Sequence, residues 1–416
     1  MAAWPGEELE VWAAEIANAA NVLLRQQAAW RHRRVETITV LSHEQVRRHV
    51  SVDFTVPEDY RESLRLSDAG EYVVPLAFLA KRPLVRFDLR NEEGHSVPLL
   101  TADQNRMIGR ELLYQVLDTE LAAQDVDDPA VTLAAGPLIE AVLADDDRRL
   151  DERIDELERE HDLEPLFDFR AMAELLARYF VVWAVVRGLE RRRVLKFAHD
   201  ERFAQRPDFS HFYAAPGCTE AWSYHVEVAV PPDLRARTTR LIDDATGAVL
   251  ATGGRNSDRP AIYFSADPRE RLVRPGLVVA YGAERWRFLA PAAIVAAVIA
   301  LLVVAPLLFA DLPSLAGSAG PAIGIVLSTS AVFSALVLRT DEHPLLRLLL
   351  VRYRLCLVAC TLAALFAAAA LGFQARSWVV WTTWVIAGLV SAVAAGILII
   401  EAMRAPSVRS SPPEEP

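Results

Sequence analysis

The sequence predicts three structural parts in order: an α+β region, a β-sandwich-like module next to a membrane, and an all-α bundle of four transmembrane helices. Three observations support this fold class. Four long apolar stretches lie in the C-terminal third, the net negative charge lies before them, and the upstream apolar residues alternate between helical and strand spacing. The expected parts are residues 1–190, 191–284 and 285–404, followed by a disordered tail at 405–416.

The four apolar stretches are long enough to cross a bilayer as helices. Each has about 19 to 23 residues without an ionisable side chain, and a helix of about 20 residues spans the hydrocarbon core. The sequence therefore predicts a multi-pass integral membrane protein, with the lipid bilayer as its first partner. The stretches run from Phe288 to Ala310, Gly320 to Leu338, Leu355 to Phe373 and Trp378 to Ile400.

The charge belongs to the part of the chain before the spans. The whole sequence has 55 acidic and 44 basic residues, a net charge of −11, whereas the segment from Phe288 onward has six acids and seven arginines. An acidic soluble region argues against binding nucleic acid through bulk electrostatics. Only Lys81 and Lys196 are lysines, and this arginine bias, together with the abundant alanine, indicates a GC-rich bacterial genome.

The arginines predict which side of the membrane faces the cytoplasm. Several precede the first span and four crowd the loop between the second and third spans, whereas residues 311–319 have none and the last loop has only Arg376. Because cytoplasmic loops carry the excess of arginine, both termini are expected in the cytoplasm, with the spans in the inner (plasma) membrane. Met1 to Glu10 lacks a secretory signal. The alternative, an exported soluble domain, requires the arginine-rich loop outside.

The first 190 residues mix helices with a small antiparallel sheet. Apolar spacing predicts a helix from Glu7 to about Arg31, and Thr101 is the expected N-cap of a mainly helical region that is broken near 127–129 and 162–165. The apolar run Phe180 to Val186 is too short to cross a bilayer, so we expect a buried core helix there. Strands are expected around 38–40, 50–56 and 85–89.

Strand spacing returns after residue 191. Short strands recur at intervals of about ten residues, which is typical of a compact β-sandwich-like module. Only Gly282 to Arg287 separates the last strand from the first span, so the module is expected to lie against the cytoplasmic face of the membrane. The expected strands are 222–230, 238–243, 248–252, 261–265 and 277–281.

Two groups of residues stand out within the spans: small residues, which allow close helix packing, and hydroxylated residues, which are polar. Gly388, Ala392 and Gly396 recur at four-residue spacing, which favours close helix contact, either within one chain or in a homo-oligomer. The hydroxyls are expected to bond to helix backbones, with lining of a substrate path as the alternative. They are Ser328, Thr329, Ser330, Ser334, Thr361, Thr382, Thr383 and Ser391.

No residue pattern identifies a catalytic, cofactor or metal site. Glu158 and His161 form one Glu-x-x-His, but a di-iron site needs two such pairs. Cys218 has no second soluble cysteine to pair with. One group of ionisable residues forms a site only if the fold brings its members together: His199, Asp200, Glu201, His211 and His225.

Three functional hypotheses follow. The first is a non-enzymatic membrane protein whose cytoplasmic domain is a sensor, scaffold or partner-binding platform, since it is large and carries no recognisable active-site motif. The second is a membrane-bound hydrolase or transferase that uses the region His199 to His225. The third is a small transporter or channel formed by oligomerised bundles.

Overall fold

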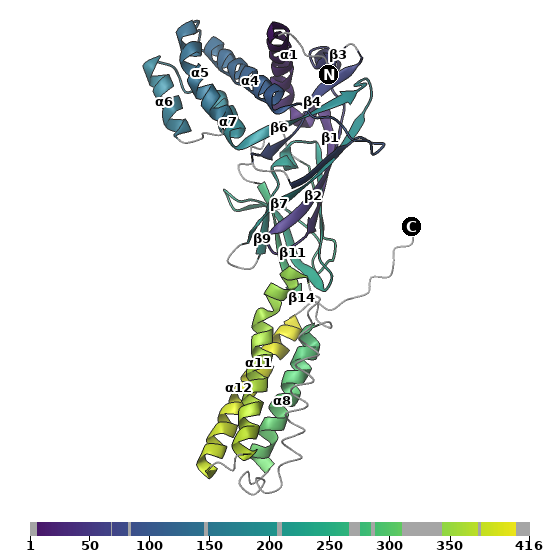
Figure 1. The fold of residues 1–416 in the computed structure, drawn as a ribbon, viewed down its shortest axis with the longest axis vertical. Helices are drawn as coiled ribbons and strands as arrows, with labels where there is room; N and C mark the ends of the chain where they lie inside the picture. The colour runs from purple at the N-terminus through teal and green to yellow at the C-terminus, as the bar shows by residue number, and fades with distance from the viewer. Residues whose placement is uncertain are drawn as a thin grey trace.

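The computed structural model describes residues 6–67, 69–81, 85–144, 149–205, 210–265, 275–283, 288–309, 343–372 and 376–404. These residues form a head that is rich in β-strands, with helices gathered at one end, and a stalk of long helices that extends from the other end (Figure 1). The description below concerns this part of the chain.

Helices cover the end of the head that lies far from the stalk (Figure 1). The helical region is broken near residues 127–129 and 162–165, as predicted. Thr101 caps the helix that follows it, with its hydroxyl accepting the Gln104 amide N–H at 3.3 Å. The helices pack on a three-stranded sheet with the order β3-β4-β6. The helices are α1 (Gly6–Arg25), α2 (Gln27–Trp30), α3 (Glu58–Arg61), α4 (Ala102–Ala123), α5 (Pro129–Leu143), α6 (Leu150–Glu160) and α7 (Phe167–Arg178), and the strands are β3 (Arg65–Ser67), β4 (Glu71–Ala80) and β6 (Tyr179–Arg187).

The prediction of a core helix at Phe180 to Val186 is wrong, because this run is strand β6. It pairs antiparallel with β4, with Trp183 opposite Pro75. A strand covered on both faces has no polar alternation, so its sequence reads as a continuous apolar run. Valines and aromatic residues fill this run, and such residues favour an extended backbone.

A six-stranded sheet forms the middle of the head. Its order is β13-β10-β1-β2-β7-β5, and its pairs are antiparallel except β1 with β10, where Arg34 lies opposite Tyr224. The sheet takes strands from both sides of residue 190. The strands are β1 (Arg31–Val40), β2 (Gln45–Phe54), β5 (Val85–Arg90), β7 (Arg193–Arg202), β10 (Ser223–Ala229) and β13 (Ala261–Phe264).

A five-stranded sheet, with the order β12-β11-β14-β9-β8, lies next to the stalk. The strands predicted after residue 191 are present, but they are shared between this sheet and the six-stranded one. A separate β-sandwich-like module is therefore not confirmed, and the division at residue 190 stays a prediction. The strands are β8 (Ala204–Gln205), β9 (Ser210–Ala214), β11 (Leu234–Asp243), β12 (Ala248–Thr252) and β14 (Pro275–Ala283), with the 3-10 turn η1 at Pro216–Thr219.

The stalk contains three described helices long and apolar enough to cross a membrane: α8 (Ala290–Phe309), α11 (Pro344–Gly372) and α12 (Ser377–Arg404). Apolar side chains cover their outer faces; Leu301 is 67 % exposed and Leu389 is 65 % exposed. Lipid is the solvent that such a surface prefers. The predicted span Gly320 to Leu338, its hydroxyls and the tail 405–416 lie outside the described residues, so a count of four spans is untested.

The head and the stalk share one hydrophobic core. A single cluster of buried residues contains Ile38 and Leu277 from the two sheets together with Leu289, the residue before α8, and Leu345 of α11. A second cluster lies between the helical end of the head and the neighbouring strands. Because buried side chains are close-packed, the first cluster fixes the sheets relative to the helices.

Candidate functional site

Buried charged side chains occupy the face of the six-stranded sheet that is turned towards the five-stranded sheet. Alternate residues of a strand point to the same face, so Arg34 and Glu36 of β1 lie on the side of Ile38. Arg48 of β2 pairs with Ile38 and shares this face. Glu36 is 0 % exposed and Arg48 is 4 % exposed. Charged residues are thus built into positions that apolar side chains would ordinarily fill.

These side chains form a chain of alternating charges, which we call the charge ladder. Arg34 donates to Glu220 at 2.5 Å through Nη1 and to Glu36 at 2.7 Å through Nε. Arg48 donates to the second Glu36 oxygen and, at 2.5 Å, to Glu201. The members, in order of contact, are Arg31, Glu220, Arg34, Glu36, Arg48 and Glu201.

The charge ladder contacts all three sheets. Arg31 donates through Nη2 to the Pro75 carbonyl oxygen on β4 at 2.8 Å, and Arg48 donates to the Ala214 carbonyl oxygen on β9 at 2.7 Å. Gly217 in η1 leaves room for this arrangement, since a Cβ there would overlap the Arg34 guanidinium. The ladder therefore fixes how the sheets are placed relative to one another.

Neighbouring charges keep Glu36 and Glu201 ionised near neutral pH. Burial opposes the charge on Glu201, but Arg48 outweighs it and holds the Glu201 pKa at about 2. Burial likewise opposes ionisation of Glu36, yet Arg48 and Arg34 keep its pKa below the ordinary value. Burial lowers the pKa of Arg31 to about 10, which leaves the guanidinium protonated. Three positive and three negative charges thus neutralise one another inside the head.

Two reactive side chains lie beside the ladder, and burial suppresses both. The Tyr224 hydroxyl is buried without a hydrogen-bond partner among the described residues, and burial raises its pKa well above 10. Burial raises the pKa of the Cys218 thiol to about 12. Neither group is prepared to act as a nucleophile or a general base near neutral pH.

The structure divides the histidine group that the sequence singles out. His199 and Glu201 point inward, with 3.6 Å between His199 Nε2 and a Glu201 carboxylate oxygen. His211 also lies in the interior, where its ring contacts Phe203 and Tyr281. Asp200, next to Glu201, points to the opposite face of the sheet and pairs there with an arginine.

His225 lies on the same outer face as Asp200, because it alternates with buried Tyr224 along β10. Its ring packs on Tyr263, with 4.1 Å between ring centroids. The five predicted residues therefore do not line one pocket. The described residues contain no group of histidine, cysteine or carboxylate side chains that could hold a metal ion. Glu158 instead accepts the Leu166 amide N–H at 2.8 Å, a structural role.

The described threonines of the spans bond to their own helices, as expected, whereas the Ser391 hydroxyl is buried without a hydrogen-bond partner among the described residues. Thr361, Thr382 and Thr383 each donate to the carbonyl oxygen four residues earlier, at 2.7 to 2.9 Å. Gly388 lies against α8, where a Cβ would be 3.2 Å from Leu307 Cδ1. For Gly396, no described residue lies within 4 Å of such a Cβ. Among the described residues, the small-residue stripe therefore packs against another helix at Gly388 but not at Gly396.

Sequence reasoning missed the charge ladder, although a signal for it exists. The apolar positions Ile38, Val50 and Val52 indicate the buried face of their strands, and the same alternation places Glu36 and Arg48 on that face. A charged residue at a buried strand position requires a partner of opposite charge. That requirement would have indicated a buried ion network, but not its distant members.

Comparison with known proteins adds no family to this picture: no protein-family model and no curated protein sequence matches the chain.

Proposed function

We propose that this chain is a bacterial inner-membrane protein whose cytoplasmic head is a non-enzymatic binding platform that senses a bound state and passes it to the membrane bundle. The core shared by the head and the stalk carries this proposal. A binding event that shifts the two sheets also shifts Leu289 and Leu345, because these residues pack in the same buried cluster.

The positions of the helix ends support four spans with both termini on the head side. Helix α8 follows β14 at the head, and α11 also begins there, because His343 bonds to Val40 of β1. The chain must therefore return to the head side between these two helices, and we assign this return to the apolar stretch Gly320 to Leu338. Helix α12 ends beside the start of α11, where the Tyr353 hydroxyl donates to Glu401 at 3.1 Å.

The arginines of α11 support a cytoplasmic head. Arg347, Arg352 and Arg354 all lie in the first turns of this helix, on the head side, whereas Arg376 is the one arginine that the structure describes at the other end of the stalk. Positive residues favour the cytoplasmic side. A cysteine-free variant that carries Glu93→Cys in the head or Arg376→Cys at the far end tests this orientation.

An impermeant maleimide is expected to label Arg376→Cys on intact spheroplasts, and to label Glu93→Cys only after the membrane is opened. Labelling of Glu93→Cys from outside would contradict the proposed orientation.

The enzyme and channel hypotheses have less support. The histidine group is divided between the two faces of the six-stranded sheet and β9 of the five-stranded sheet, and the described threonines of the spans bond to their own backbones. Purified protein is expected to hydrolyse generic ester and phosphate substrates no faster than a variant with His199→Ala and His211→Ala. Turnover that this double variant abolishes would overturn the non-enzymatic assignment.

The transmission step needs a separate measurement. Amide hydrogen exchange of α11 is measured in liposomes with and without a cross-linked partner on the head. The proposal expects a change in exchange in the first turns of α11, and the same change reduced in a His343→Ala variant. An unchanged α11 would show that the head is a passive anchor.

A further inference from the structure

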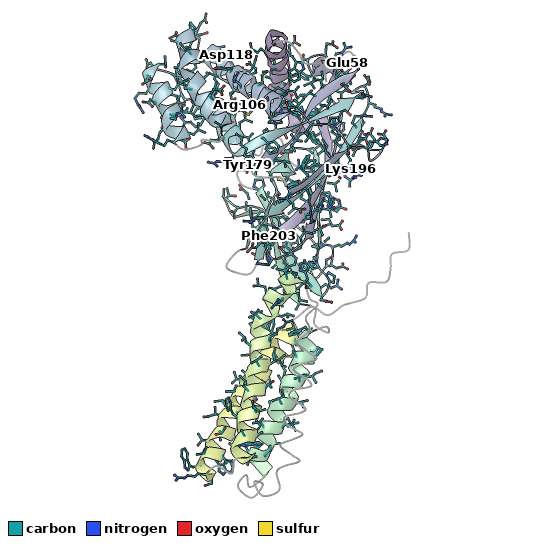
Figure 2. The ribbon with its side chains drawn as sticks, in the orientation of Figure 1. Glu58, Arg106, Asp118, Tyr179, Lys196 and Phe203 are labelled. Atoms are coloured by element: carbon teal, nitrogen blue, oxygen red, sulfur yellow. The ribbon has the colours of Figure 1, made fainter. Side chains whose placement is uncertain are left out.

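The outer face of the six-stranded sheet carries a hollow of about 280 Å³, formed by β1, β2, β5 and β7. This face lies opposite the charge ladder, because its residues alternate with the buried ones. The volume is near the lower end of the range for small-molecule sites. Figure 2 shows Lys196 higher in the head than Phe203, which lies near the junction with the stalk.

The pairing of the strands places hydrogen-bond donors next to one another in this hollow. Ser51 lies between Val35 of β1 and Lys196 of β7, and Lys196 in turn pairs with Arg90 of β5. In the next row, Thr37 lies opposite His49. Neighbours on one face of a sheet lie within reach of a shared ligand. Hydroxyl, ammonium and imidazole groups therefore converge on one region.

The acidic side chains on this face are neutralised by arginines, whereas one basic side chain at the hollow is not neutralised. Its aspartates are each paired with an arginine: Asp53 with Arg192 at 2.6 Å, Asp88 with Arg90 at 2.7 Å and Asp200 with Arg47 at 3.2 Å. Glu227 of β10, which lies opposite Thr37, is paired with Arg259 at 3.9 Å.

Lys196 is exposed and makes no ion pair with any residue that the structure describes. A positive charge thus stays uncompensated at the hollow of a protein whose net charge is −11.

We propose that this hollow binds a small oxyanion, a molecule bearing a carboxylate or phosphate group, with the Lys196 ammonium as the charge and the Ser51 and Thr37 hydroxyls as donors. Lysine binds such groups as a point charge, and hydroxyl donors fix their orientation. The location away from the stalk disfavours a lipid headgroup as the source. The inference rests on the proposed function in one respect, since it names the ligand class of the platform.

The two lysines of the chain allow a direct test on the full-length protein. Acylation with an amine-reactive acetyl ester is followed residue by residue by mass spectrometry, with inorganic phosphate or citrate added at matched ionic strength. The anion is expected to slow acylation of Lys196 at least threefold. Lys81, which donates to the Val142 carbonyl oxygen elsewhere in the head, is the internal control and should be unaffected.

Variants separate the site from general charge effects. Ser51→Ala is expected to abolish most of the protection of Lys196, whereas Arg240→Gln, which removes an exposed arginine from β11, leaves it unchanged. Protection by phosphate alone or by citrate alone would identify the oxyanion class. Equal slowing of both lysines, or no slowing with either anion at tens of millimolar, would overturn the proposal.

The acylation and hydrogen-exchange experiments distinguish failure of the oxyanion site from failure of transmission to the membrane helices. Protection of Lys196 without any change in α11 hydrogen exchange would keep the oxyanion site and reject this ligand as the transmitted signal. If neither anion protects Lys196 from acylation, the oxyanion site is rejected, whereas the proposal of a binding platform is unaffected.

Discussion

His343 Nε2 lies 3.2 Å from the carbonyl oxygen of Val40, across 303 positions of sequence. The carbonyl can only accept, so Nε2 carries the proton, and Nδ1 is then free to accept the Leu345 amide N–H at 3.3 Å. One neutral imidazole therefore bonds to the last residue of β1 and caps the first turn of α11. The head and the bundle meet at this ring as well as at their shared core.

Replacing His343 with alanine should weaken the junction without unfolding the head. Two hydrogen bonds are lost, which corresponds to about 1 to 2 kcal/mol. A lower thermal midpoint in detergent is expected, and His95→Ala, in an exposed loop, is the control. Equal midpoints for the two variants would show that the imidazole contributes nothing to the junction.

Replacing Glu36 with glutamine should be among the most damaging single changes in the head. Arg34 and Arg48 would keep their buried charges and lose the shared counter-charge, at a cost of about 3 to 5 kcal/mol. Asp53→Asn is the matched control, because its partner Arg192 is exposed and solvent screens such a pair, so that it contributes little to stability. Urea unfolding followed by tryptophan fluorescence compares the two variants. Similar midpoints would contradict a structural role for the ladder.

Acid should weaken the head through Glu201. Its pKa is about 2 in the fold, against an ordinary value of 4.5, so the folded state favours the ionised form. The stabilisation is complete above pH 4.5 and is lost as the pH falls towards 2. Thermal midpoints between pH 6 and pH 2.5 measure this loss. Glu201→Gln should show a flatter dependence over the same interval, and an unchanged slope would refute the assignment.

Two glycines of α12 should respond differently to valine. Gly388→Val places methyl groups against Leu307 of α8, and overpacking of this kind costs about 1 to 3 kcal/mol. Gly396→Val meets no described residue, so the thermal midpoint in detergent should barely change. If copies of the chain associate through the Gly388, Ala392 and Gly396 face, Gly396→Val should also lower the yield of cross-linked dimer.

The elements that the sequence predicts well are those with local causes. The described spans follow from the length of their apolar runs, and the Thr101 cap follows from its own side chain and Gln104. Strand β6 shows the limit of such reasoning. Spacing does not distinguish a buried strand from a buried helix in a short apolar run, and only pairing with β4 decides it.

The arrangement of the head depends on contacts that no local pattern records. Arg34 meets Glu220 across 186 positions, and β1 pairs in parallel with β10. The histidine group illustrates the same gap, since neighbours in sequence such as Asp200 and Glu201 lie on opposite faces of one sheet. Alternation along the strand predicts that these two residues lie on opposite faces of the sheet. It does not predict which elements pack against each face.

The parallel pairing of β1 with β10 affects how the protein is made. One edge of β1 stays open until Ser223 and its neighbours leave the ribosome, roughly ten to forty seconds later at usual rates of translation. During that interval the exposed edge is vulnerable to pairing with the wrong strand. The first hydrophobic span emerges soon afterwards, so closure of the sheet and delivery to the translocon overlap in time. A chaperone that shields nascent β-strands should therefore raise the yield of this protein.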